Sequence, residues 1–168
     1  MTYRILTVCT GNICRSPMAE YALRDALERA GLGEQVEVAS VGTTREEIGN
    51  PIDPRAGALL RSHGLDPSAH RARQMSSRDL GDADLVLALD HDHVRPLHRA
   101  GGQEIIDRLH MVRDFAPGPV EDTGIRDPWW GDESNFELAW EQITEAAPGI
   151  IEHVRTALQR EGRSGGRP

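Results

Sequence analysis

A cysteine and an arginine lie six positions apart near the N-terminus, close enough to act on one substrate. They belong to the segment Cys9-Thr10-Gly11-Asn12-Ile13-Cys14-Arg15-Ser16. An apolar run at residues 5–8 precedes it and a helical pattern follows from Pro17, which predicts a loop between a strand and a helix N-terminus. Such a position binds anions, and a thiol there ionises readily. Because a guanidinium binds phosphate well, the segment predicts a nucleophile within a phosphate-binding loop.

The spacing of the cysteine and the arginine is weak by itself, since a lone cysteine is most often a small buried apolar residue. The residues between them favour a functional loop. Gly11 permits an unusual backbone angle, and Asn12 tolerates left-handed geometry. Ser16 can cap the helix and donate a hydrogen bond to the thiolate of Cys9. The separation of Cys9 and Cys14 does not match the Cys-x-x-Cys pattern of dithiol redox proteins.

Hydrophobic periodicity and turn residues predict alternating strands and helices. Strands are expected at residues 3–8, 36–40, 84–89 and 108–112. Helices are expected at residues 17–30, 53–63, 77–80 and 90–99. Ser16 would be the N-cap of the first helix, and Pro96 would limit the last of these four. A long final helix is expected to open on a capping box at residues 134–137 and to bend at Pro148-Gly149.

Strands that alternate with helices predict an α/β fold. The expected architecture is a three-layer α-β-α arrangement with a four-stranded parallel sheet and a phosphate loop between the first strand and the first helix. Ligands bind at the carboxyl ends of strands in such sheets, where Cys9 is expected. We expect a single domain over residues 1–160 and a flexible C-terminal tail over residues 161–168.

Composition narrows the class of protein. The chain has 168 residues, of which 38% are apolar, enough for the core of one domain. The net charge of -8 argues against nucleic acid as a partner. No apolar run is long enough for a membrane helix, and residues 5–8 are too few for a signal peptide. Two cysteines do not make a disulfide framework, so a cytoplasmic location is expected.

The chain resembles the low-molecular-weight protein tyrosine phosphatases. The segment 8–17 matches the phosphate loop of that family, and the similarity extends over nearly the whole chain. Further matches are Ser40-Val-Gly-Thr43, His63-Gly64, Arg71-Ala-Arg-Gln74, Arg113-Asp-Phe115, and Asp127-Pro128 with Gly131.

The resemblance implies a phosphatase that works through a phosphocysteine on Cys9, with Arg15 holding the phosphate. The phosphate-binding residues would be Thr10, Gly11, Asn12, Ile13, Cys14, Arg15 and Ser16. No cofactor and no metal are expected. The His91 and His93 pair with Asp90 and Asp92 has the residue types of a metal site, but a charged helix start is the favoured interpretation.

The leaving group needs a proton, and the residues alone do not choose among Asp114, Asp122, Asp127 and Asp132. The family places its general acid in an Asp-Pro pair before the last helix, which Asp127-Pro128 matches. The proline favours an extended backbone at Asp127, which would project the carboxyl group over the phosphate loop.

The resemblance also assigns supporting roles. Asn12, Ser16 and His70 would support the loop. The alternative interpretation of His70 is a solvated histidine on the surface. Cys14 matches a second family cysteine that can form a protective disulfide with Cys9. A simple buried thiol is the alternative for Cys14.

Four residues are expected to form the wall of the substrate slot, Ile13, Glu46, Trp129 and Trp130. Related bacterial enzymes usually have an aromatic residue near the position of Glu46, and they typically have tyrosines where this chain has the two tryptophans. The alternative interpretation is that one or both tryptophans pack in the core. Phosphoarginine phosphatases of the family carry threonine where this chain has Ile13, so phosphotyrosine is preferred to phosphoarginine.

The expected partners are phosphotyrosine-containing proteins or peptides, with inorganic phosphate and similar oxyanions as inhibitors. Two other activities are disfavoured. A thioredoxin-linked arsenate reductase needs two further cysteines that the chain lacks. An idle phosphate-binding module would not need a nucleophile, an arginine and a candidate acid together.

Overall fold

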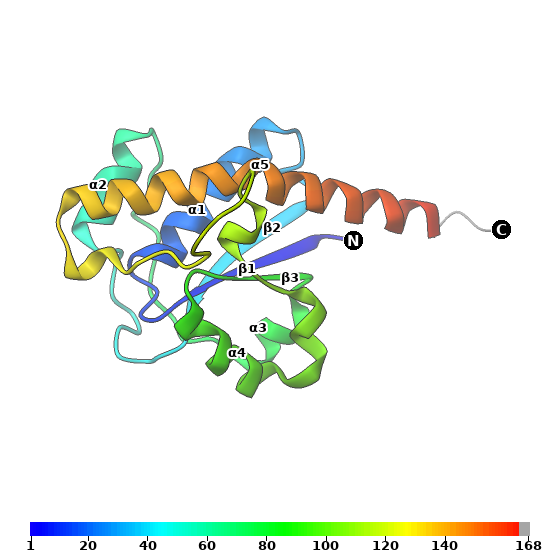
Figure 1. The fold of residues 1–168 in the computed structure, drawn as a ribbon, viewed down its shortest axis with the longest axis horizontal. Helices are drawn as coiled ribbons and strands as arrows, with labels where there is room; N and C mark the ends of the chain where they lie inside the picture. Colours follow the sequence, from blue (N-terminus) through cyan, green and yellow to red (C-terminus); the bar gives the residue numbers. More distant parts are fainter. Residues whose placement is uncertain (165–168) are drawn as a thin grey trace.

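Four parallel strands form the only sheet of the computed structural model, which describes residues 1–164 (Figure 1). The sheet order is β2-β1-β3-β4, with bounds β1 Tyr3–Cys9, β2 Val36–Gly42, β3 Leu85–Ala88 and β4 Leu109–Met111. Cys9 pairs with Gly42 at the end of β1, and Val8 pairs with Ala88. Because all strands are parallel, their carboxyl ends meet at one edge of the sheet.

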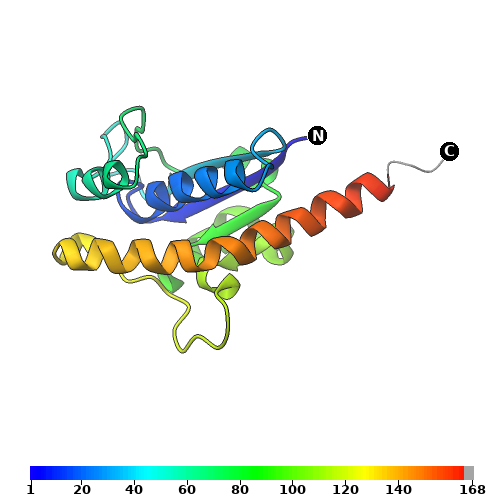
Figure 2. The ribbon, with the colours of Figure 1, turned by 90° about the horizontal axis from the view of Figure 1, so that it is seen from above.

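Helices cover both faces of this sheet (Figures 1 and 2). One face packs against α1 (Arg15–Arg29) and α5 (Glu133–Ser164), with α2 (Pro54–Ser62) beside them. The other face packs against α3 (Ser77–Asp82) and α4 (Val94–Gly101). The strands are near-continuous apolar runs because both of their faces are buried. The predicted three-layer α/β architecture is confirmed.

The start of α1 differs from the prediction. The helix begins at Arg15, two residues before Pro17, and the N-cap position is Cys14, whose side chain makes no capping hydrogen bond. The expectation that Ser16 is the N-cap is therefore wrong. The hydroxyl of Ser16 is instead bonded to Asn12 and lies beside Cys9, inside the loop that precedes the helix.

The segment after β3 also differs. A short 3-10 helix, His91–His93, leads directly into α4, which continues to Gly101. Pro96 does not limit this helix, because it lies in the first turn, where a backbone N–H has no partner within the helix.

The long helix α5 opens two residues earlier than expected. Asp132 accepts from the backbone N–H of Ser134 and donates its own backbone N–H to the side chain of Asn135. The capping box predicted at residues 134–137 is therefore wrong, because Asp132 supplies the cap. Figure 2 shows α5 changing direction about midway, and Pro148 is the proline within it.

The end of α5 overlaps the predicted tail. Residues 161–164 are helical, and residues 165–168 of that tail lie outside the described residues. The domain boundary at residue 160 stays a prediction. Within residues 1–164, no helix combines the length and the apolar character needed to cross a lipid bilayer.

Candidate active site

The loop between β1 and α1 carries a series of free backbone N–H donors. The backbone N–H groups of residues 10–15 donate no hydrogen bond to any part of the chain that the structure describes. The loop is held from outside by its carbonyls, since Thr43 and Thr44 donate to Cys9 and Thr10, and Asp53 donates to Ile13. Converging free N–H groups at a helix N-terminus bind an anion.

Two backbone features shape this loop. Asn12 has a φ of 60°, in the left-handed region that an asparagine tolerates better than most residues. Gly42, at the end of β2, passes so close to the loop that an added Cβ would lie 2.6 Å from the carbonyl oxygen of Thr10. A side chain at position 42 would therefore push the loop away from the sheet.

Beneath the loop, a buried hydrogen-bond network reaches the sulfur of Cys9. The Oγ of Ser16 lies 3.0 Å from this sulfur, and the side-chain amide of Asn12 donates to Ser16 and to Ser40, each at 2.9 Å. The backbone N–H of Arg73 donates to the Oδ1 of Asn12 at 3.0 Å. The network joins the loop to β2 and to the segment before α3.

His70 lies against the same loop. It is buried, and its Nε2 is 2.7 Å from the carbonyl oxygen of Asn12. The imidazole therefore contacts the loop at its left-handed residue rather than lying in solvent.

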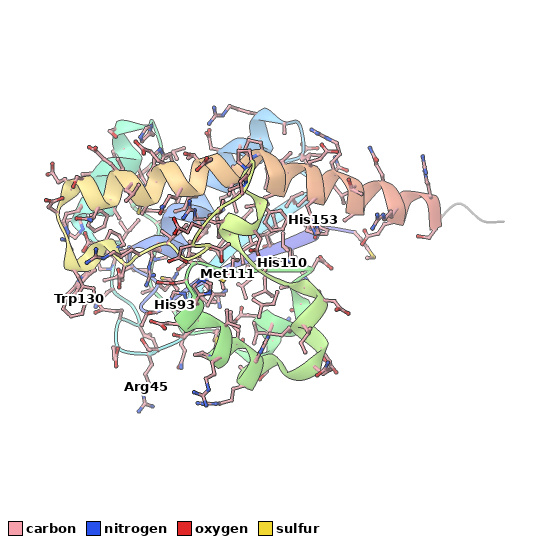
Figure 3. All side chains as sticks on the ribbon, viewed as in Figure 1. Arg45, His93, His110, Met111, Trp130 and His153 are labelled. Atoms are coloured by element: carbon pink, nitrogen blue, oxygen red, sulfur yellow. The ribbon has the colours of Figure 1, made fainter. Side chains whose placement is uncertain are left out.

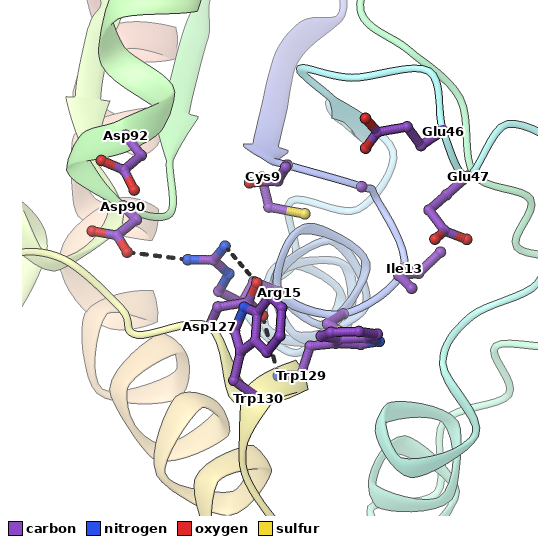
Figure 4. Close-up of a pocket in the computed structure, with 13 residues that line it drawn as sticks. Cys9, Ile13, Arg15, Glu46, Glu47, Asp90, Asp92, Asp127, Trp129 and Trp130 are labelled. Atoms are coloured by element: carbon purple, nitrogen blue, oxygen red, sulfur yellow. Dashed lines mark hydrogen bonds and ion pairs between the residues drawn. The ribbon is translucent and has the colours of Figure 1, made fainter.

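Arg15 is buried and held by three groups. Its Nη1 donates to Asp90 at 3.2 Å and to the carbonyl oxygen of Ile125 at 2.8 Å, and its Nη2 is 3.4 Å from Asp127 (Figure 4). Asp90 was not singled out as a partner of Arg15 from the sequence. Its position directly after β3, the strand beside β1, is the signal that would have found it.

Of the four candidate acids, only Asp127 lines the pocket above Cys9. It also accepts from the backbone N–H of Trp129, at the start of the 3-10 helix Pro128–Trp130. The other three bind backbone elsewhere: Asp114 binds Met111, Asp122 binds Gly124, and Asp132 caps α5.

A cavity of about 500 Å³ opens over the loop. Figure 4 shows the sulfur of Cys9 directed into it. Its apolar surface comes from Ile13, Trp129 and Trp130. The two tryptophans contact each other edge to face and are 44% and 77% exposed, so neither packs in the core. The predicted wall residue Glu46 lies at the mouth with Glu47.

Arg55 is a further side chain that the sequence did not reveal. It pairs with Asp53, donates to the carbonyl oxygens of Trp129 and Gly131, and lies over the ring of Phe136 at 4.6 Å. It thereby ties the loop that carries Asp127 to the start of α2.

Cys14 and Cys9 are both free thiols. Burial, reinforced by Asp53, raises the pKa of the Cys14 thiol far above its usual range. Cys14 is therefore held as an uncharged thiol within the loop, where it is one of the residues that line the cavity. Within residues 1–164 no group of three or more His, Cys, Asp or Glu side chains is arranged to hold a metal ion.

Comparisons with known proteins agree with this geometry. Residues 4–163 match the family described as low molecular weight phosphotyrosine protein phosphatase. The chain is 42% identical over 158 residues to low molecular weight protein-tyrosine phosphatase A of Mycobacterium tuberculosis, covering 94% of each chain. It is 41% identical over 166 residues to low molecular weight protein-tyrosine-phosphatase of Streptomyces coelicolor, covering 98% of this chain and 99% of the relative.

Solved structures give the same result. The protein tyrosine phosphatase of Entamoeba histolytica superposes with a TM-score of 0.87 at 26% identity, covering 93% of this chain and 99% of the other. YfkJ of Bacillus subtilis superposes with a TM-score of 0.87 at 29% identity, covering 94% and 97%. With the loop, the buried arginine and the matched length taken together, the chain belongs to the low molecular weight phosphotyrosine protein phosphatase family.

Proposed function

We propose that this protein hydrolyses phosphotyrosine in proteins or peptides, and other aryl phosphate monoesters, through a phosphocysteine intermediate. The observation that carries the proposal is that Cys9 lines one cavity together with the buried Arg15 and a loop whose backbone N–H groups, residues 10–15, are free. Such donors stabilise the charge that develops on a transferring phosphoryl group.

In the first step, the thiolate of Cys9 attacks phosphorus in line, so that an S–P bond forms as the ester P–O bond breaks. Asp127 gives its proton to the departing phenolate oxygen. In the second step, Asp127 takes a proton from an attacking water. The S–P bond then breaks, which restores the thiolate and releases inorganic phosphate.

The supporting residues act on the loop rather than on the substrate. Asn12 and His70 hold its left-handed turn. Ser16 supplies a hydroxyl to the sulfur of Cys9, on which negative charge returns when the intermediate breaks. We assign Cys14 no step in turnover; its family role as a disulfide partner of Cys9 stays a prediction.

The walls of the cavity support an aryl substrate. Ile13 and the two exposed tryptophans offer apolar surfaces to a flat ring. The acidic mouth favours the alternative, phosphoarginine, because the guanidinium that departs is a cation. We prefer phosphotyrosine because the bulky side chain of Ile13 lies inside the slot itself.

A thiol nucleophile acts only while reduced, so we propose that the protein works in the cytoplasm. We also propose that inorganic phosphate and similar oxyanions inhibit it by occupying the N–H groups of the loop.

The test compares initial rates on phosphotyrosine, phosphoarginine and phosphoserine peptides of one sequence, without added metal. We expect phosphotyrosine to be turned over fastest, with a burst of about one product per active site. Cys9→Ser should abolish both the burst and turnover. Full activity in Cys9→Ser would overturn the mechanism, and faster turnover of phosphoarginine would overturn the substrate assignment.

A further inference from the structure

A buried histidine in the segment after β3 contacts the phosphate loop, which follows the neighbouring strand β1. The Nε2 of His93 lies 2.9 Å from the side-chain oxygen of Thr10, the residue that follows Cys9. His93 is 1% exposed, whereas Thr10 lines the cavity beside the sulfur of Cys9. The contact arises because β1 and β3 are neighbours, and the segments after them leave the sheet side by side.

The direction of this hydrogen bond follows from the other nitrogen of the ring. The backbone N–H of Asp90 donates to the Nδ1 of His93 at 3.0 Å, so Nδ1 is an acceptor without a proton. A neutral imidazole carries one N–H, which must then be on Nε2. His93 therefore donates to the hydroxyl oxygen of Thr10.

The proton of the Thr10 hydroxyl is consequently left for another acceptor. Within residues 1–164, this hydroxyl has no hydrogen-bond partner except His93. Since Thr10 is exposed and lines the cavity, the acceptor that its proton can reach lies in the space where the substrate phosphate is expected.

We propose that the hydroxyl of Thr10 donates a hydrogen bond to a non-bridging oxygen of the bound phosphoryl group, and that His93 is the positioning residue that turns this hydroxyl toward it. The inference rests on the proposed function. It adds one side-chain donor to the backbone N–H groups and Arg15.

Burial and the charge of Arg15 keep His93 in the neutral form that donates from Nε2. Burial, and then the positive charge of Arg15, lower the pKa of His93 to about 3, so the ring stays neutral at working pH. Asp90 also couples the two donors, since its backbone N–H fixes the ring of His93 while its carboxylate binds Arg15. One residue after β3 thus orients two groups that face the phosphate.

The test compares Thr10→Val, which keeps the shape and loses the hydroxyl, with Thr10→Ser, which keeps the hydroxyl. We expect Thr10→Val to lower kcat/KM by about 10- to 100-fold, and Thr10→Ser to stay within about threefold of the wild type. The loss should be equal on phenyl phosphate and p-nitrophenyl phosphate, because the donor contacts the phosphoryl group and not the leaving group. Thr123→Val, which alters a half-buried threonine outside the cavity, is the matched control.

His93 is tested through its coupling to Thr10. His93→Leu should weaken inhibition by inorganic phosphate, and the double variant with Thr10→Val should be no worse than Thr10→Val alone. A merely structural role of His93 would make the two losses multiply, which would overturn its positioning role. Wild-type activity in Thr10→Val, or equal losses in Thr10→Val and Thr10→Ser, would overturn the role of Thr10.

The outcome is separable from that of the proposed function. Calorimetric titration with inorganic phosphate reads the Thr10 donor without any turnover, and Thr10→Val should bind phosphate more weakly than the wild type. If the wild type hydrolyses no aryl phosphate, the proposed function fails. If it does, and Thr10→Val binds and hydrolyses normally, only the Thr10 inference fails.

Discussion

The Oγ atom of Ser16 lies 3.0 Å from the Sγ atom of Cys9, on the buried side of the phosphate loop. The amide of Asn12 donates to this hydroxyl, whose own proton can go to the sulfur of Cys9 or to the carbonyl oxygen of Val41, 3.3 Å away. A donor at this distance stabilises negative charge on the sulfur.

Ser16→Ala should therefore lower kcat by about 10-fold or more, because the sulfur leaves as a thiolate when phosphocysteine is hydrolysed. Rapid-mixing kinetics should show a burst of phenolate followed by a slower steady state. Ser62→Ala, on the exposed side of α2, serves as control and should behave as the wild type. An unchanged kcat in Ser16→Ala would show that the hydroxyl is only structural.

Asp127→Ala should slow turnover in proportion to how poor the leaving group is. We expect a loss of about 100-fold or more on phenyl phosphate and a much smaller loss on an ester with a strongly acidic phenol. Kinetics on a series of substituted phenyl phosphates would measure this. Asp122→Ala, on the same long loop, should leave the series unchanged. Equal losses across the series in Asp127→Ala would remove Asp127 from the acid role.

Asn12 should be needed for folding stability as well as for activity. Asn12→Ala removes two donated hydrogen bonds and one accepted bond in a buried site, and puts an alanine at a φ of 60°. We expect a loss of about 2–4 kcal/mol in the free energy of unfolding.

Asn12→Gly separates the two causes, because glycine adopts the left-handed backbone without strain. It should recover about 1 kcal/mol relative to Asn12→Ala. Urea denaturation followed by circular dichroism measures both values. Equal stabilities of the two variants would mean that the backbone angle costs nothing.

His93 should make the protein less stable in acid. Its pKa is lowered to about 3, so below about pH 6.5 the unfolded chain binds a proton that the folded chain does not. The contribution of His93 therefore becomes more destabilising as the pH falls from about 6.5 to about 3, by up to about 1.4 kcal/mol per pH unit. Above about pH 6.5, the titration of His93 should no longer affect the free energy of unfolding.

His93→Gln should accordingly flatten the plot of unfolding free energy against pH between about 4 and 6, relative to the wild type. Arg15, whose charge acts on the ring, and Asp90, whose backbone N–H binds it, remain in place in this variant. His98→Gln, which alters an exposed histidine on α4, is the matched control. Parallel curves for wild type and His93→Gln would contradict the prediction.

The mouth of the cavity should select the residues that flank phosphotyrosine. It is lined by the carboxylates of Glu46, Glu47, Asp90, Asp92 and Asp127, with Arg15 as the only cation among its lining residues. Glu46 and Glu47 accept hydrogen bonds from the neutral side chains of Thr44 and Asn50. Arg45, which lies on the same loop, is not among the lining residues and projects outward from the molecule (Figure 3).

A phosphotyrosine peptide with flanking arginines should therefore have a lower KM than a matched peptide with flanking glutamates. We expect a ratio of about 3 to 10 at low salt, which shrinks as ionic strength rises. Glu46→Gln with Glu47→Gln should reduce the ratio, whereas Glu34→Gln, away from the mouth, should not. A ratio of KM values that changes neither with ionic strength nor with these substitutions would contradict selection by charge.

The local part of this architecture could be predicted from the sequence because its signals are local. Apolar runs mark the four strands, and the residues between Cys9 and Arg15 mark the loop. Ser16 was misassigned as an N-cap because the same hydroxyl fits two roles, and the tertiary network of Asn12 and Cys9 takes precedence over the local one.

The partners of the loop could not be predicted in this way. Asp90, His93 and Arg55 each contact residues far away in sequence, and their contacts depend on strand order and on how the segments leave the sheet. The choice of Asp127 among four aspartates needed the family resemblance for the same reason. Hydrophobic periodicity predicts which face of a helix or strand is buried, but not which distant side chains contact that face.

The position of β1 in the sheet has a consequence for how the protein acquires activity. Because the sheet order is β2-β1-β3-β4, the groups around Cys9 come from segments far apart in the chain, including Ser40, His70, Asp90 and Asp127. Contacts of such long sequence separation form slowly, because large loops must close before they can be made. During refolding, turnover should return only with the slowest phase, after most secondary structure, which makes activity a reporter of the fully folded chain.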